Sequence, residues 1–186
     1  ERIAAGSALF AELGDQRGLS YAKHLQGELL YHRGEMEAAR NVLEESIAQA
    51  RQTGMWWLPP LSLSVLGWMA RRAGDTARAL TLLRESLTLL RDRYNKTECV
   101  TTLERWAGAA AGAGRSIEAA TVLGAAEALR EAMRSPVAPV ERADHARALA
   151  DAREHLDPSD FARAWDQGRA MALEDWTKVI DFALGE

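Results

Sequence analysis

Three segments of the chain superpose without gaps at intervals of forty residues, and this internal repeat constrains the fold more than any other feature. They read RGEMEAARNVLEES, AGDTARALTLLRES and AGRSIEAATVLGAA. A repeat of this length predicts a supersecondary unit that buries its apolar face only by stacking on its neighbours. Four columns of small or apolar residues match in all three units: Gly34, Gly74 and Gly114; Ala39, Ala79 and Ala119; Leu43, Leu83 and Leu123; and Gly27, Gly67 and Ala107.

Each unit is predicted to be a helical hairpin. The glycine of the first column ends one helix in a left-handed C-cap, a conformation that glycine adopts without Cβ strain. The two small columns let the paired helices approach closely, and we expect the leucine column to fill the space between units. Ala, Leu, Arg and Glu dominate the composition and favour helix. We therefore predict an all-α fold, with helices near residues 19–33, 36–53, 59–73, 76–93, 98–112 and 116–134.

The repeat register stops after Pro136, which divides the chain into two parts. Residues 1–135 are predicted to form about three and a half repeat units, and residues 136–186 to form capping helices of the same domain. The first dozen residues resemble the second helix of a preceding unit, so we expect the polypeptide to extend upstream.

The C-terminal part is predicted to contain three helices that cap the open end of the array. Pro139 can begin the first of them. Asp157 and Pro158 suit the N-cap and first position of the next, which Gly168 is expected to end. A short helix near residues 173–184 closes the chain. The expected apolar faces are Ala146, Leu149, Ala150, Ala152 and Leu156 in the first helix, and Phe161, Ala164 and Trp165 in the second.

The matched columns resemble those of the tetratricopeptide repeat, because Gly27, Gly34, Ala39 and Leu43 fall at that motif's spacing. The period of forty departs from the thirty-four residues of that repeat. The tyrosine that the motif usually carries is replaced by Leu30 and Ala70, and its late proline is absent. The resemblance implies a right-handed α-solenoid of hairpins, with longer helices or connections and a helical cap.

The C-terminal part resembles the end of large LuxR-type, maltose-activator-like ATP-dependent bacterial transcriptional regulators, and of related cyclase-linked ATPases. The residues that carry this resemblance are AATVLGAAEALREAMRSPVAPVERADHARALADAREHL and FARAWDQGRAMALEDW. Ala172 departs from the Ser or Thr that such proteins often have before their last helix. The resemblance implies a cytoplasmic sensor domain that follows a nucleoside-triphosphatase module in the same polypeptide.

A binding groove is expected on the concave face of the predicted solenoid. The tetratricopeptide resemblance places positions i, i+3, i+7 and i+10 of each first helix on that face. Their aromatic, charged and hydroxyl groups suit a protein, a peptide or a small-molecule effector. The alternative is that later helices fold over the groove and fill it. The groove positions are Tyr21, His24, Glu28 and Tyr31; Leu61, Ser64, Trp68 and Arg71; and Thr101, Glu104, Gly108 and Ala111.

The sequence offers no catalytic, cofactor-binding or metal-binding motif. The glycine-rich run at residues 108–116 has five residues between Gly108 and Gly114, and Arg115 stands where a phosphate-binding loop needs lysine. The four histidines lack the i, i+4 spacing of a helical zinc pair. Cys99 is the sole cysteine, which excludes an internal disulfide. The net charge of −4 argues against direct nucleic-acid binding.

One charge-free stretch, QTGMWWLPPLSLSVLGWMA, approaches the length of a membrane span. Pro59 and Pro60 interrupt it, and the repeat register divides it into a connection and the start of a helix, where proline is tolerated. We therefore predict no membrane insertion. Trp56 and Trp57 either pack under the connection or mark a contact surface.

The favoured function is a non-enzymatic binding and scaffolding domain that also contacts other modules of its own polypeptide. The alternative is a structural module that self-associates as a homodimer through an apolar surface near Trp56 and Trp57.

Overall fold

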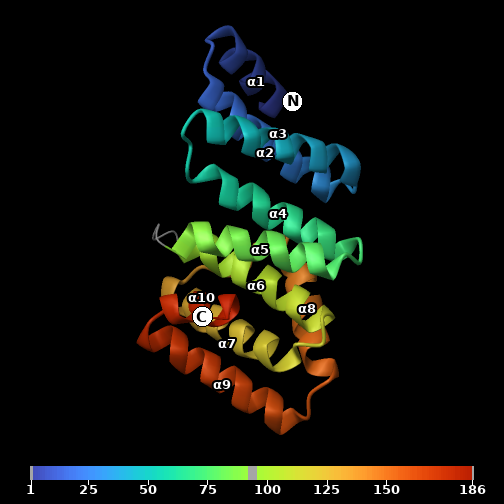
Figure 1. The fold of residues 1–186 in the computed structure, drawn as a ribbon, viewed down its shortest axis with the longest axis vertical. Helices are drawn as coiled ribbons and strands as arrows, with labels where there is room; N and C mark the ends of the chain where they lie inside the picture. The colour runs from blue at the N-terminus through green and yellow to red at the C-terminus, as the bar shows by residue number, and fades with distance from the viewer. Residues whose placement is uncertain (1, 92–95, 186) are drawn as a thin grey trace.

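The computed structural model describes residues 2–91 and 96–185, and within these ranges the chain forms ten helices and no strand (Figure 1). The all-α prediction is confirmed. The predicted end of helix 76–93 lies outside the described residues. The helices are α1 Arg2–Glu12, α2 Gln16–His32, α3 Met36–Gln52, α4 Leu58–Arg72, α5 Thr76–Arg91, α6 Lys96–Gly112, α7 Ser116–Met133, α8 Arg142–Glu154, α9 Pro158–Glu174 and α10 Thr177–Leu184.

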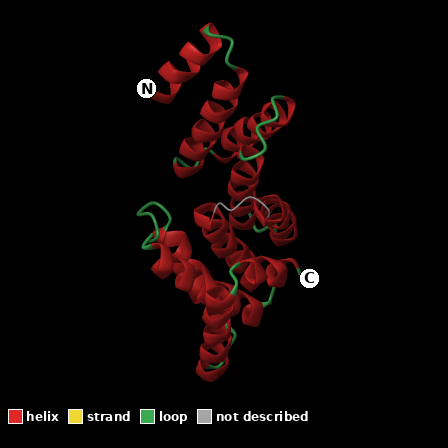
Figure 2. Ribbon diagram, turned by 90° about the vertical axis from the view of Figure 1, so that its left-hand side faces the viewer, coloured by secondary structure: helices red, strands yellow, loops and turns green. Residues whose placement is uncertain are grey.

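Consecutive helices pack side by side from α1 to α7, as the colour progression in Figure 1 shows. Helices α2 and α3, α4 and α5, and α6 and α7 form three pairs joined by short turns. Helices α3 and α5 also pack on the first helix of the next pair. Figure 2 shows that the elements form an elongated, curved stack rather than a sphere.

The turns within the three pairs have one geometry. Gly34, Gly74 and Gly114 have φ values of +81°, +83° and +77°. In each turn the glycine N–H donates to the carbonyl three residues back, and the next N–H donates to the carbonyl five residues back. Gly14 and Gly54 repeat the same pattern between pairs, with φ values of +67° and +68°. The predicted left-handed C-caps are thus confirmed. Their N–H groups donate hydrogen bonds to carbonyl groups in the last turn of each helix, which would otherwise lack a partner.

The leucine column packs inside its own hairpin. A Cβ on Gly27 would lie 2.5 Å from Cγ of Leu43, and a Cβ on Gly67 would lie 2.6 Å from Cγ of Leu83. Both leucines are fully buried. We expected this column to fill the space between units; the structure shows instead that each leucine uses the room that its partner helix leaves by lacking a side chain.

A serine column also repeats. The Ser46 hydroxyl donates to the Ser20 carbonyl at 2.8 Å, and the Ser86 hydroxyl donates to the Pro60 carbonyl at 2.7 Å. All four groups are buried, and each bond spans twenty-six residues. The two bonds tie the second helix of a pair to the start of the first.

The charge-free stretch divides as predicted. Trp57 is the N-cap of α4, and Pro59 and Pro60 lie in the first turn of that helix, where no intrahelical N–H bond is lost. None of the described helices combines the length and the apolar character that crossing a bilayer requires. Trp56 and Trp57 are 54% and 38% exposed.

Helix α9 packs closely against α7, and the two backbones come nearest at Gly124 of α7 and Gly168 of α9. A Cβ on Gly124 would lie 2.9 Å from Cα of Trp165, and a Cβ on Gly168 would lie 2.7 Å from the Thr121 carbonyl carbon. We expected Gly168 to end this helix, but that prediction is wrong, because α9 continues to Glu174. Asp157 and Pro158 begin α9 as predicted. Helix α10 packs against α5, α7 and α9.

Helix α8 departs most from the expected cap. It packs against α6 and α7 and lies across the first helices of the pairs. Ala148 and Ala152 are its buried residues. Ala146 and Ala150, which we expected on the apolar face, are exposed.

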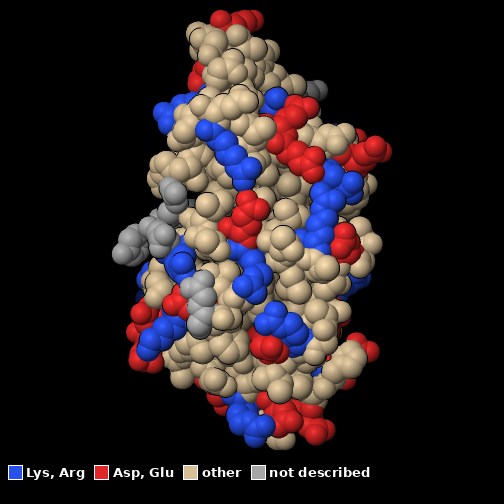
Figure 3. All heavy atoms as spheres, viewed as in Figure 1, with Lys and Arg blue, Asp and Glu red and all other residues tan. Residues whose placement is uncertain are grey.

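Charge is finely mixed on the face shown in Figure 3, where acidic and basic groups interleave. Exposed ion pairs join α3 to α5: Arg51 lies 2.8 Å from Glu85, and Arg78 lies 3.4 Å from Glu44. Such exposed pairs contribute little to stability.

Candidate functional site

The predicted groove residues all lie on α2, α4 and α6, the first helices of the three pairs. We call the side of these helices that bears them the inner face. The structure divides the inner face into a part that α8 covers and a part that it leaves open. The covered part includes Tyr31, Trp68, Arg71 and Glu104, and the open part includes Tyr21, Glu28 and Leu61.

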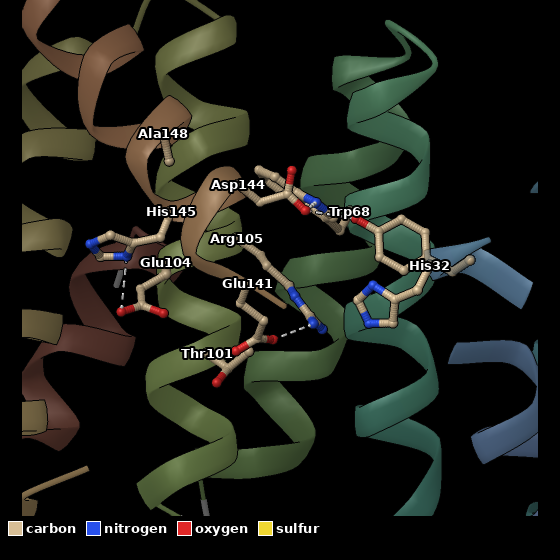
Figure 4. Close-up of a pocket in the computed structure, with 10 residues that line it drawn as sticks. His32, Trp68, Thr101, Glu104, Arg105, Glu141, Asp144, His145 and Ala148 are labelled. Carbon is tan, nitrogen blue, oxygen red and sulfur yellow. Dashed lines mark hydrogen bonds and ion pairs between the residues drawn. The ribbon is translucent and has the colours of Figure 1, made fainter. Parts of the chain in front are cut away.

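One carboxylate of α8 joins two aromatic residues of the inner face. Oδ2 of Asp144 accepts hydrogen bonds from the Tyr31 hydroxyl and from Nε1 of Trp68, both at 2.9 Å. Figure 4 shows the carboxylate pointing toward the indole. Tyr31 and Trp68 are each 3% exposed, so Asp144 supplies the acceptor that the buried hydroxyl and indole N–H need. The Tyr31 oxygen also accepts from Arg72 at 3.5 Å.

A second carboxylate of α8 pairs with Arg71. Its guanidinium contacts Asp151, donates from Nε to the Gly108 carbonyl at 2.7 Å, and stacks over the Trp68 ring at 4.5 Å. The guanidinium thus links α4, α6 and α8 in one contact. This use of both charge and ring stacking suits arginine better than lysine.

Small residues make room for this contact. A Cβ on Gly108 would lie 2.9 Å from the Trp68 ring and 3.1 Å from Cβ of Ala148. We expected Gly108 and Ala111 to leave space for a ligand; next to Gly108, the Trp68 indole and Ala148 fill that space. About 30 Å³ remains between α8 and the inner face, which is room for little more than a water molecule.

A buried ion pair underlies α8. Both Glu104 oxygens accept from Arg130 of α7, at 2.6 and 2.7 Å, and Nδ1 of His145 lies 3.3 Å from Oε1 (Figure 4 shows the histidine contact). Burial alone would raise the pKa of Glu104, but the contacts with Arg130 and His145 outweigh it and lower that pKa. The same contact with Glu104 raises the pKa of His145. The carboxylate is therefore held as an anion.

His24 and Ser64 lie between first helices rather than facing an open groove. Nδ1 of His24 lies 3.0 Å from the Ser62 hydroxyl, and Thr102 donates to Ser64 at 3.0 Å. Burial, together with the charge of Arg105, lowers the pKa of His24 to about 4. His24 is therefore neutral at pH 7 and ties α2 to α4.

The open part of the inner face carries aromatic and acidic groups. Tyr21 is 39% exposed and meets the Trp57 ring edge-on at 5.6 Å. Glu28 lies 3.7 Å from His24, and burial raises the pKa of Glu28 against the opposing charge of Arg105. Leu61 is half-buried. This part remains accessible while α8 is in place.

Arg105 marks the border between the two parts. It donates to the Ser64 hydroxyl at 3.0 Å and to Glu141, just before α8, at 2.9 Å. Thr101 lies beside it on α6 and accepts from Arg130 at 3.3 Å. Figure 4 shows Arg105 and Glu141 joined below Asp144.

Sequence reasoning missed the partners that α8 supplies. Glu141, Asp144, Ala148 and Asp151 follow the spacing i, i+3, i+7 and i+10, so they form one stripe along the helix. The sequence predicted an apolar face for this helix, whereas the stripe that meets the inner face is mostly acidic. The i, i+3, i+7 and i+10 spacing that defined the inner-face positions would therefore also have identified the residues of α8 that contact the inner face.

Two further features bear on chemistry: the single cysteine and the grouping of possible metal ligands. Burial, and the charge of Glu98, raise the pKa of the Cys99 thiol to about 12, so the thiol stays protonated at pH 7. Among the residues that the structure describes, no three His, Cys, Asp or Glu side chains are grouped to hold a metal ion.

Comparison with known proteins gave no match: no family model, no curated protein and no solved structure matches the chain.

Proposed function

We propose that the chain is a non-catalytic module that binds a protein or peptide on its inner face, and that it is built as a right-handed α-solenoid of tetratricopeptide-like hairpins. One observation carries this proposal: the inner face already holds a helix, α8, through side chains of α2, α4 and α6 together. The contacts are hydrogen bonds and ion pairs from aromatic and arginine side chains, which are common anchors in protein recognition.

The wider context that we propose is the cytoplasmic sensor of a LuxR-type ATP-dependent transcriptional regulator. It rests on the resemblance of the residues from α7 to α10. Binding on the inner face, of a protein or of a small-molecule effector, would then change how this module packs on its neighbours. If this context is right, the full-length polypeptide hydrolyses ATP. A full-length protein that does not hydrolyse ATP would contradict the context.

The binding proposal is tested by selecting peptides from a displayed random library on the immobilised chain. We expect the selected peptides to lose binding to Tyr21→Ala, because Tyr21 is an exposed aromatic of the open part. Thr81→Ala, on the exposed surface of α5, is the control and should leave binding unchanged. Peptides whose binding ignores Tyr21→Ala, Leu61→Arg and Arg105→Ala alike would contradict recognition by the inner face.

A second function, self-association, is favoured by the exposure of two neighbouring tryptophans. Trp56 and Trp57 are 54% and 38% exposed, and large exposed aromatics are enriched at interfaces. Sedimentation velocity tests this: a dimer that Trp56→Ser and Trp57→Ser together convert to a monomer supports it. A wild-type chain that stays monomeric at high concentration refutes it.

A further inference from the structure

Helix α8 is held mainly by polar contacts. Glu141, Asp144 and Asp151 each pair with a different group of the inner face: Arg105, the Tyr31–Trp68 pair, and Arg71. Its buried residues are two alanines, Ala148 and Ala152, and Leu149 is half-buried. A helix held this way buries little apolar surface, so little hydrophobic free energy opposes its release.

Helices α9 and α10 also have packing contacts that do not involve α8. Helix α9 lies against α7 at the crossing of Gly124 and Gly168, and α10 packs on α5 and α9. Residues 135–141 before α8 and 155–157 after it are not helical. The connection before α8 contains Pro136 and Pro139, which make it a semi-rigid spacer, and the connection after α8 is three residues long. Release of α8 requires these two connections to rearrange, whereas the contacts of α9 with α7 and of α10 with α5 need not change.

We propose that α8 is an internal ligand of the inner face, and that the partner of this chain is an acidic helix that binds by displacing α8. This inference rests on the proposed binding function. The partner helix carries carboxylates at the spacing of Glu141, Asp144 and Asp151, and a small residue at the position of Ala148.

The chemistry of the covered part sets these requirements. Arg71 and Arg105 are cations that need carboxylates, and the Tyr31 hydroxyl and the Trp68 N–H need one shared acceptor. The Ala148 position favours a small side chain, because Ala148 is buried and packs against Gly108, which has no side chain of its own. A basic or bulky helix would leave both arginines unpaired or would not reach them.

Occupation by α8 lowers the apparent affinity of any competing helix. The apparent affinity is the intrinsic affinity multiplied by the fraction of molecules in which α8 has left the covered part of the inner face. If that fraction is about 1–10%, binding of the competing helix is weakened about 10- to 100-fold. Occupation by α8 makes binding selective, because a partner must match the contacts of α8 in order to replace it.

The test uses a fluorescent peptide with the sequence of residues 138–156, titrated onto the full chain. The release variant is Asp144→Ala with Asp151→Ala, and the charge-matched control is Asp166→Ala with Glu174→Ala, both of which are exposed on α9. We expect the peptide to bind the release variant at least about tenfold more tightly than wild type or the control. A peptide with the same two aspartates replaced by alanine should not bind.

Equal affinity for the wild type and the release variant overturns the proposal, as does no binding to a release variant that keeps its helical circular dichroism. If the release variant does not fold, hydrogen exchange on the wild type decides. Faster exchange in α8 than in α7 and α9 supports displacement, and equal protection of all three refutes it. If this proposal fails but the library peptides still lose binding to Tyr21→Ala, the proposed binding function on the inner face is still supported.

Discussion

Replacing Gly168 by alanine is expected to destabilise the protein by about 2 kcal/mol, although the same change in an exposed helix usually stabilises. Gly168 lies in the interior of α9, so alanine gains about 1 kcal/mol of helix propensity. Against this, the new Cβ would overlap the Thr121 carbonyl oxygen, and it would lie 2.7 Å from the carbonyl carbon of that residue and 3.0 Å from the Ala125 nitrogen. Ordinary contact begins near 3.4 Å.

The helices can relieve this overlap only by separating, because all three of these atoms belong to the backbone of α7. A gap of about 0.5–1 Å forfeits a quarter to a half of each contact energy along the interface. We set this loss near 3 kcal/mol, at the upper end of the usual cost of overpacking, which leaves a net destabilisation of about 2 kcal/mol after the propensity gain. For a chain of this size that lowers Tm by about 4–8 °C.

Urea and thermal unfolding, followed by circular dichroism, measure the effect. The matched control is Gly6→Ala in α1, where an added Cβ meets nothing within 4 Å, and it should be neutral or stabilising by up to about 1 kcal/mol. Gly124→Ala should resemble Gly168→Ala, and the double variant should cost less than the sum, because one separation relieves both overlaps. A Gly168→Ala variant as stable as the control would refute the close crossing.

Three further predictions concern charge. Burial lowers the pKa of His24 from 6.5 to about 4, so protonating it disfavours the folded state. The free energy of unfolding is therefore highest above pH 6.5 and falls by up to about 3 kcal/mol as the pH drops toward 4. Urea titrations should show this acid loss in wild type and much less of it in His24→Gln. Glu104→Gln leaves Arg130 charged and buried without its anion, and should cost about 3 kcal/mol in the same assay, whereas a change below 1 kcal/mol would contradict the pairing. The pKa of His145 is raised, so its contribution is complete below pH 6.5 and is lost as the pH rises through that raised pKa. The stability difference between wild type and His145→Gln should therefore shrink between pH 6 and pH 9, and a constant difference would refute the contact with Glu104.

The repeat made most of the helices predictable. The columns at Gly34 and Gly27 fix a turn and a close approach, which are local requirements that a single sequence can reveal. Pro59 and Pro60 were likewise decisive, since they can begin a helix but not continue one. The boundaries of α2 to α4 accordingly fall within a few residues of those predicted.

The placement of α8 was not predictable in the same way. Its contacts with α2 and α4 span more than seventy residues, and they depend on polar pairs rather than on an apolar stripe. Gly168 was misread for a related reason: a glycine that admits a neighbouring backbone looks like a helix stop until the neighbour is known. The site residues on α2, α4 and α6 could be located, but what covers them could not.

Positions 27 and 28, adjacent in the chain, serve different partners: Gly27 faces the leucine of its own hairpin, while Glu28 lies on the inner face. The same division recurs at Gly67 and Trp68. The small residue is nearly constant from unit to unit, whereas its neighbour is acidic, aromatic or absent as a side chain. The framework and the inner-face contacts are therefore assigned to adjacent residues, and of the three second positions only Glu28 could be varied without disturbing the contact between Trp68 and Gly108.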